Sequence, residues 1–286
     1  MKGKSRRRRY TAGVAVPEVS ASGRVSAFGD DTLLIVAGML TLFGVMMVYS
    51  ASVYVAYRNY EVDWFIFFKQ LRALPFGVAA LLIGLKMDIG FWERWIKVAM
   101  LAMIVLMVLQ LTTPMGPVVR GTRRWVDFRL FRLQSSEFAK VLVVMYLARV
   151  LTEYPEYLRR FNLSVFKGLV FPLFLVVAVC LQPDLSSAFI IVLIIGLMLY
   201  VGGVNRLFLA ICGFLSALGF GWEVWRNPYQ WERIIGFLNR LPDRSGPYYQ
   251  TYQSMVGFAR GGLFGVGLGE SNQKMLFLPE PHSDFI

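Results

Sequence analysis

Long apolar blocks separated by short polar connections dominate the chain after residue 31. A helix needs about 20 mainly apolar residues to cross the hydrocarbon of a bilayer. Two blocks, the second and the fourth, are short and are expected to extend through residues 65–70 and Glu137. The blocks cover residues 33–53, 71–85, 95–111, 138–151, 166–181, 185–201 and 207–225. The pattern predicts an all-α fold, a polytopic transmembrane helical bundle of about seven spans.

The composition favours a membrane protein over an ordinary soluble enzyme. Of the 286 residues, 56 % are hydrophobic and only 17 % are charged, whereas soluble domains carry about 25 % charged residues. Cys180 and Cys212 both lie in apolar blocks, so the sequence offers no disulfide framework and no cysteine zinc site. The single histidine, His282, excludes a His-rich metal site.

A basic arm at the start of the chain predicts the orientation of the bundle. Between Met1 and Arg24 there are seven basic residues and one acid, Glu18. Cytoplasmic segments carry an excess of Lys and Arg, and no short apolar run follows the arm as it would in a signal peptide. The net charge of +12 therefore relates to topology and anionic lipids rather than to nucleic acid. We expect three parts: a cytoplasmic tail (1–31), the bundle (32–226) and a long extracytoplasmic loop (227–286).

One predicted outer loop, residues 113–136, breaks this charge rule. A basic cluster on the outer side opposes the cytoplasmic bias. The planar guanidinium group of arginine donates two parallel hydrogen bonds to a phosphate. Charge alone leaves two interpretations open: the orientation is wrong, or the cluster binds an anionic ligand. The loop holds Arg120, Arg123, Arg124, Arg129 and Arg132 against one acid, Asp127.

Several charged residues lie at the ends of predicted spans. Glu137 and Lys140 are three residues apart and so share one helix face. They form either a structural ion pair or a site in which Lys140 faces an anionic substrate and Glu137 orients it. Snorkelling explains Lys69, and Asp184, which follows the helix-ending Pro183, is placed to cap the sixth span.

Six motifs, which occur in order, identify a family resemblance. They are MVYSAS at 47–52, GTRRW at 121–125, QSSEFAK at 134–140, QPDLSSA at 182–188, YQTYQS at 249–254, and GESNQKMLFLPEPHSDFI at 269–286. With them the chain resembles the SEDS (shape, elongation, division and sporulation) family of bacterial membrane proteins, and most of all its FtsW-type division branch. Two departures stand out. Ser135 occupies a position where the family usually has proline, and the chain stops inside the final Asp-Phe-Ile motif, whereas family members continue for several spans.

This resemblance implies a peptidoglycan glycosyltransferase that polymerises lipid II at the outer face of the cytoplasmic membrane during cell division. The essential aspartate of the final motif maps to Asp284, which would act as general base on the 4-hydroxyl of the acceptor sugar. A divalent cation, Mg²⁺ or Mn²⁺, would help an ordinary aspartate in this role, but no ligand cluster marks its site. The predicted substrate-binding residues are Arg124, Arg132, Lys140, Glu137, Arg233, Lys69, Trp125, Gln273, Lys274 and His282.

The resemblance also implies partners and a location. The partners are lipid II, a class B penicillin-binding transpeptidase and other divisome membrane proteins, and the location is the bacterial cytoplasmic membrane at the septum. We expect little activity from residues 1–286 alone, because Asp284 lacks the helices that follow it in the family.

Two other functions stay open. A lipid II flippase would need a charged path at mid-membrane, but Lys97, Arg149 and Glu223 all lie near span ends. A non-enzymatic divisome scaffold that recruits a transpeptidase would not explain the arginines of the outer loop.

Overall fold

Helices make up most of the computed structural model, which describes residues 31–113, 124–127, 132–153, 164–238, 249–267, 269–275, 277–278 and 282–283. Residues 1–30 of the basic tail therefore lie outside the described residues. The helices are α1 (Asp31–Tyr60), α2 (Phe65–Lys86), α3 (Ile89–Thr112), α4 (Ser135–Glu153), α6 (Ser164–Leu181), α7 (Leu185–Val201), α8 (Arg206–Arg226), α9 (Pro228–Leu238) and α10 (Tyr249–Gly261). Two short strands, β1 (Trp125–Asp127) and β2 (Arg132–Gln134), and a 3₁₀ turn, η1 (Asn272–Lys274), complete the list.

Each of the predicted apolar blocks is a helix, from α1 to α8. The second and fourth blocks extend through their flanks as predicted, because α2 begins at Phe65 and α4 begins at Ser135. Helices α1, α2, α3 and α8 are long and apolar enough to cross a membrane, and the apolar parts of α6 and α7 are shorter. The prediction of an all-α, polytopic membrane fold is confirmed.

Helices α4 and α7 form the centre of the bundle. Helix α4 packs against α3, α6 and α7, and α7 packs in turn against α6 and α8. Their buried apolar side chains, among them Val143, Leu147 and Ile191, belong to one hydrophobic cluster. Helices α4 and α6 approach closely, because a Cβ atom on Gly168 would lie only 2.7 Å from Cγ1 of Val150. Helices α3, α6 and α8 pack around this centre and expose apolar side chains outward, as membrane spans do.

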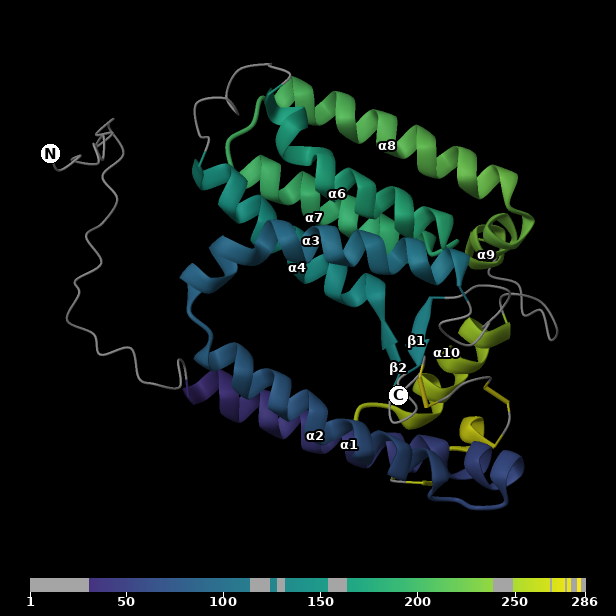
Figure 1. Ribbon diagram of the computed structural model, residues 1–286. Coiled ribbons are helices and arrows are strands. Elements are labelled where there is room, and N and C mark those ends of the chain that lie inside the picture. Colours follow the sequence, from purple (N-terminus) through teal and green to yellow (C-terminus); the bar gives the residue numbers. More distant parts are fainter. Residues whose placement is uncertain are drawn as a thin grey trace, which may run out of the picture.

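Helices α1 and α2 form a pair beside the α3–α8 bundle (Figure 1). Aromatic rings join the two helices: Tyr49 lies 5.3 Å from Phe67 between ring centroids, and Tyr60 stacks on Phe65 at 4.0 Å. The two helices carry many exposed large apolar side chains, and α2 buries none of its residues. Such faces suit contact with lipid tails.

The segments predicted on the outer side gather at one end of the helices. Figure 1 shows β1, β2, α9 and α10 at this end. Strands β1 and β2 are antiparallel, with Trp125 opposite Gln134. The sequence did not predict this hairpin, because three residues are too few for a strand pattern to be recognised. Helices α9 and α10 both lie in the segment after residue 226.

Candidate functional site

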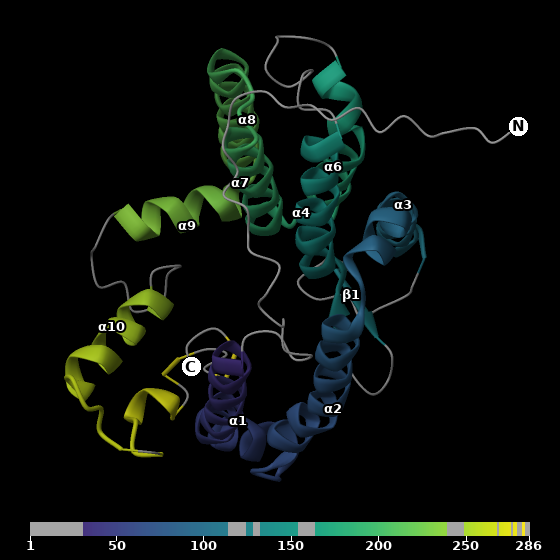
Figure 2. The same cartoon turned by 90° about the vertical axis from the view of Figure 1, so that its left-hand side faces the viewer.

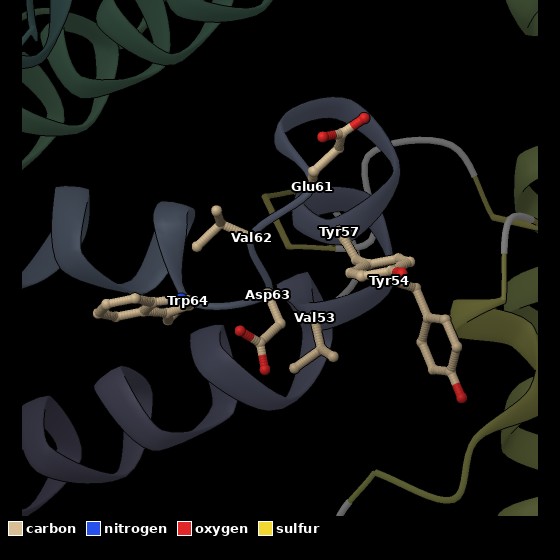
Figure 3. Close-up of a pocket in the computed structure, with 7 residues that line it drawn as sticks. All are labelled: Val53, Tyr54, Tyr57, Glu61, Val62, Asp63 and Trp64. Carbon is tan, nitrogen blue, oxygen red and sulfur yellow. The ribbon is translucent and has the colours of Figure 1, made fainter.

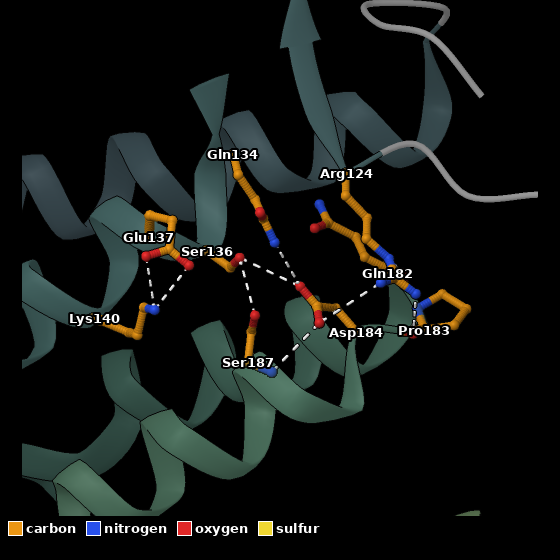
Figure 4. A network of polar contacts seen from close by, with 9 residues as sticks. All are labelled: Arg124, Gln134, Ser136, Glu137, Lys140, Gln182, Pro183, Asp184 and Ser187. Carbon is orange, nitrogen blue, oxygen red and sulfur yellow. Dashed lines mark hydrogen bonds and ion pairs between the residues drawn. The ribbon is translucent and has the colours of Figure 1, made fainter. Parts of the chain in front are cut away.

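A buried carboxylate, Asp184 in the turn between α6 and α7, is the centre of a polar network (Figure 4). It is 5 % exposed and accepts hydrogen bonds from Gln134 Nε2 at 3.0 Å and Ser136 Oγ at 3.4 Å. It also accepts a hydrogen bond from the backbone N–H of Ser187 at 3.3 Å, so Asp184 caps the start of α7 as predicted. One side chain therefore holds together β2 and the starts of α4 and α7.

Arg124, just before β1, ties the hairpin to the same turn. Its Nη1 lies 3.7 Å from Oδ1 of Asp184, and its Nε donates to the carbonyl oxygen of Gln182 at 3.0 Å. The guanidinium group also donates to the carbonyl oxygen of Pro183. Because these contacts use several of its donors, Arg124 is held in a fixed position with its charge partly compensated by Asp184.

A second buried layer lies next to this network and joins three helices. Gln182 Nε2 donates to Gln110 Oε1 at 3.0 Å, and the same oxygen accepts from Ser135 Oγ at 2.8 Å. All three side chains are buried. Proline at position 135 would lack this hydroxyl. Ser135, which departs from the family pattern, thus donates a hydrogen bond that links α4 to Gln110 of α3.

Two other predicted cations also contact carboxylates. Lys140 Nζ lies 2.8 Å from Glu137, whose side chain is more than half exposed. Arg132 Nε lies 3.0 Å from Asp127 on the exposed side of the hairpin. The ion pair between Glu137 and Lys140 is therefore present, and a role for this pair in binding substrate remains a prediction.

A second set of contacts fastens the segment around η1 to α1. Lys274 Nζ donates to Ser50 Oγ at 2.7 Å, and the backbone N–H of Gly269 donates to the same oxygen at 3.2 Å. Burial lowers the pKa of the Lys274 ammonium group below its ordinary value. The buried Gln273 donates to Gln253 Oε1 of α10 at 3.3 Å. This segment is thus joined to both α1 and α10.

The remaining predicted site residues lie on separate elements. Trp125 is half-buried in β1, whereas Lys69 on α2 and Arg233 on α9 are exposed. His282 lies in a turn with Ser283. Asp284, which carries the predicted catalytic role, lies outside the described residues, as do residues 114–123 and 128–131 of the basic loop.

Several residues at these contacts had no role in the sequence-based prediction. Gln134, Ser136 and Ser50 belong to quoted motifs, so their signal was present, but nothing in the motifs identified their partners. Gln253 likewise belongs to a quoted motif, whereas Gln110 could have been noticed only as an amide in an apolar segment. Within the described ranges, no three His, Cys, Asp or Glu side chains come close enough to hold a metal ion.

A pocket of about 490 Å³ lies at the turn between α1 and α2 (Figure 3). Two carboxylates, Glu61 and Asp63, face it among aromatic rings, so its charge does not suit a pyrophosphate. The rings of Tyr57 and Trp64 are exposed, as expected for aromatic residues at the level of a membrane interface. The pocket is lined by Val53, Tyr54, Tyr57, Glu61, Val62, Asp63 and Trp64.

Comparison with known proteins gives a consistent result over most of the chain. The model of the FtsW, RodA and SpoVE family, described as cell cycle protein, matches residues 30–286. The "Probable peptidoglycan glycosyltransferase FtsW" of Saccharophagus degradans is 34 % identical over 257 residues, which are 90 % of this chain and 66 % of that protein. The "Stage V sporulation protein E" of Bacillus subtilis is 35 % identical over 259 residues, which are 90 % of this chain and 70 % of that protein. The chain thus spans about two thirds of the length of these relatives.

A solved structure has a similar fold. It is described as "Structural coordination of polymerization and crosslinking by a peptidoglycan synthase complex". One of its chains matches with a TM-score of 0.55 and 24 % identity, over 78 % of this chain and 66 % of that chain. At this identity the match supports the fold alone.

Proposed function

The chain belongs to the FtsW, RodA and SpoVE family of cell cycle proteins, and from this premise we propose that it is a peptidoglycan glycosyltransferase. It polymerises lipid II at the outer face of the cytoplasmic membrane during cell division. Its proposed partner is a class B penicillin-binding transpeptidase, together with other divisome membrane proteins at the septum. Relatives named as FtsW support the activity.

One observation supports this proposal most strongly: motifs far apart in the sequence meet at one end of the helices. Ser50 contacts Lys274, which is 224 residues later, and Arg124 contacts Asp184. Lys140 lies near the start of α4, at the end where α4 follows β2. An enzyme that acts on a lipid-linked pyrophosphate needs cations beside apolar helices, and the cations at this end of the bundle support the proposal.

The proposed reaction assigns one role to each group. Asp284 accepts the proton of the acceptor 4-hydroxyl while this oxygen attacks the anomeric carbon of the growing strand. The bond from that carbon to the phosphate oxygen breaks, and undecaprenyl pyrophosphate leaves with the electron pair. Arg124, Arg132, Lys140, Arg233 and Lys69 are the candidate cations that stabilise the charge of the leaving pyrophosphate.

The other predicted residues have supporting roles in this scheme. Gln273 and Lys274 position the final segment through α10 and α1. Trp125 packs the hairpin or a sugar face, and His282 contacts substrate near Asp284. A bound Mg²⁺ or Mn²⁺ would bring charge stabilisation to the pyrophosphate, and its need is tested by adding a chelator to the assay below.

A polymerisation assay tests the proposal. The complete gene product is purified with its transpeptidase partner and given lipid II, and glycan products are separated on a gel. Wild type is expected to make polymer and Asp284→Asn is expected to make none, since positioned base catalysis contributes about 10²–10⁴-fold. Glu280→Gln is the matched control, because a phosphate leaving group needs no acid, and it should retain polymer formation. Equal polymer from wild type and Asp284→Asn would refute the assigned base.

A further inference from the structure

Helix α9 has an apolar face that the protein leaves uncovered. Trp231, Ile234 and Leu238 are 48 %, 42 % and 64 % exposed. Their i, i+3, i+7 spacing places them on one stripe of the helix. Glu232 and Arg233 are also exposed but lie toward the opposite side of the helix. Helix α9 is thus amphipathic, with both of its faces open.

An exposed apolar stripe on α8 leads directly to α9. Along α8 the exposed side chains recur on one side of the helix, as expected for a span that faces lipid. The stripe consists of Leu207, Ile211, Phe214, Leu215, Leu218, Trp222 and Trp225. It ends in two tryptophans, whose rings lie 5.3 Å apart between centroids. Tryptophan is enriched at the boundary between lipid and water, so α8 reaches the membrane interface at this point.

The direction of α9 matches this boundary. Asn227 ends α8, and its backbone carbonyl accepts the first hydrogen bonds of α9 from Gln230 and Trp231. Figure 1 shows α9 nearly end-on at the end of α8, and Figure 2 shows it at full length across the view. The two axes therefore cross. A helix that crosses the axis of a span at the span's end lies along the membrane surface.

We propose that α9 lies in the outer membrane interface and inserts Trp231, Ile234 and Leu238 among the lipids. Amphipathic helices of this kind bury their apolar face about 5–10 Å into the boundary between headgroups and acyl chains. The face with Glu232 and Arg233 then points to water above the headgroups. The occupant of the apolar face is lipid, because α9 begins directly after the exposed stripe of α8, which ends in Trp222 and Trp225.

Spin labels placed on the two faces test this proposal. Both native cysteines are replaced (Cys180→Ala and Cys212→Ala), and single nitroxide labels are attached in the variants Ile234→Cys and Glu232→Cys. A label at Leu218→Cys on the lipid-facing stripe of α8 provides the lipid reference. Each protein is placed in nanodiscs of phosphatidylethanolamine and phosphatidylglycerol, and collisions with oxygen and with a water-soluble nickel complex are compared.

The label at position 234 is expected to collide several-fold more with oxygen than with nickel, as at position 218, whereas the label at position 232 should favour nickel. Equal nickel accessibility at positions 234 and 232 would overturn the proposal. So would a label at position 234 that both reagents fail to reach, because protein rather than lipid would then cover the face. A label at position 218 that favours oxygen shows that the helices are folded in the membrane, and nickel access at position 232 shows that the polar face of α9 reaches water.

Discussion

Replacing Asp184 by asparagine removes the charge of the central carboxylate but keeps the shape of the side chain. Asparagine caps a helix as well as aspartate does, so the bond from the Ser187 N–H to the retained oxygen survives. The new Nδ2 group would face the Nε2 donor of Gln134, and that hydrogen bond would be lost. Arg124 would also lose its carboxylate partner.

The size of the effect follows from these contacts. A hydrogen bond to a charged group contributes about 1.5–3 kcal/mol. The contact with Arg124 adds about 0–1 kcal/mol, because the guanidinium group is partly exposed and 3.7 Å away. We therefore expect Asp184→Asn to lower the free energy of unfolding by about 1.5–4 kcal/mol. At about 2–4 °C per kcal/mol the unfolding midpoint would fall by roughly 3–16 °C.

The assay is thermal unfolding of the purified protein in nanodiscs, followed by intrinsic fluorescence. Asp127→Asn is the matched control, because Asp127 pairs with Arg132 in the same hairpin but at an exposed position. That change should cost only about 0–1 kcal/mol. A midpoint of Asp184→Asn that falls no further than that of Asp127→Asn would refute the argument that Asp184 fastens the hairpin.

Two further tests address other parts of the structure. Ser50→Ala and Lys274→Met should each destabilise the protein, and the double variant should lose about 0.5–1.5 kcal/mol less than the sum, because both remove one hydrogen bond. Additive losses would show that this contact contributes nothing. Gly168→Ala should cost about 1–3 kcal/mol, because its Cβ would meet the stiff side chain of Val150. Gly213→Ala in α8 meets no atom within 4 Å and should be neutral or stabilising, and an equal loss from both changes would contradict the close packing of α4 and α6.

The spans could be predicted from sequence because each depends on its own residues. An apolar run long enough to cross a bilayer specifies a helix without reference to partners, and α7 matches its predicted block at both ends. Capping by Asp184 is equally local, since Ser187 is three residues away. The hairpin β1–β2 was missed because its strands are short and are held by Arg124 and Gln134, whose partners lie 50 or more residues away.

The site could be predicted only in part, for the same reason. The spacing of Glu137 and Lys140 already offered an ion pair for Lys140. Charge patterns did not reveal that Asp184 is the carboxylate neighbour of Arg124 or that Asp127 is the neighbour of Arg132. Ser50 belongs to a quoted motif, but nothing in that motif identified its partner. Its partner Lys274 lies 224 residues further along the chain.

The central claim is that the protein polymerises lipid II from the outer side, and one measurement tests it most directly. The complete gene product and its transpeptidase partner are placed in sealed vesicles in one known orientation, and fluorescent lipid II is added to one leaflet. Polymer should form only when the side that carries residues 227–286 faces the added lipid II, and the label should stay in its leaflet. Movement of lipid II to the opposite leaflet without polymer would contradict the claim and would favour a flippase.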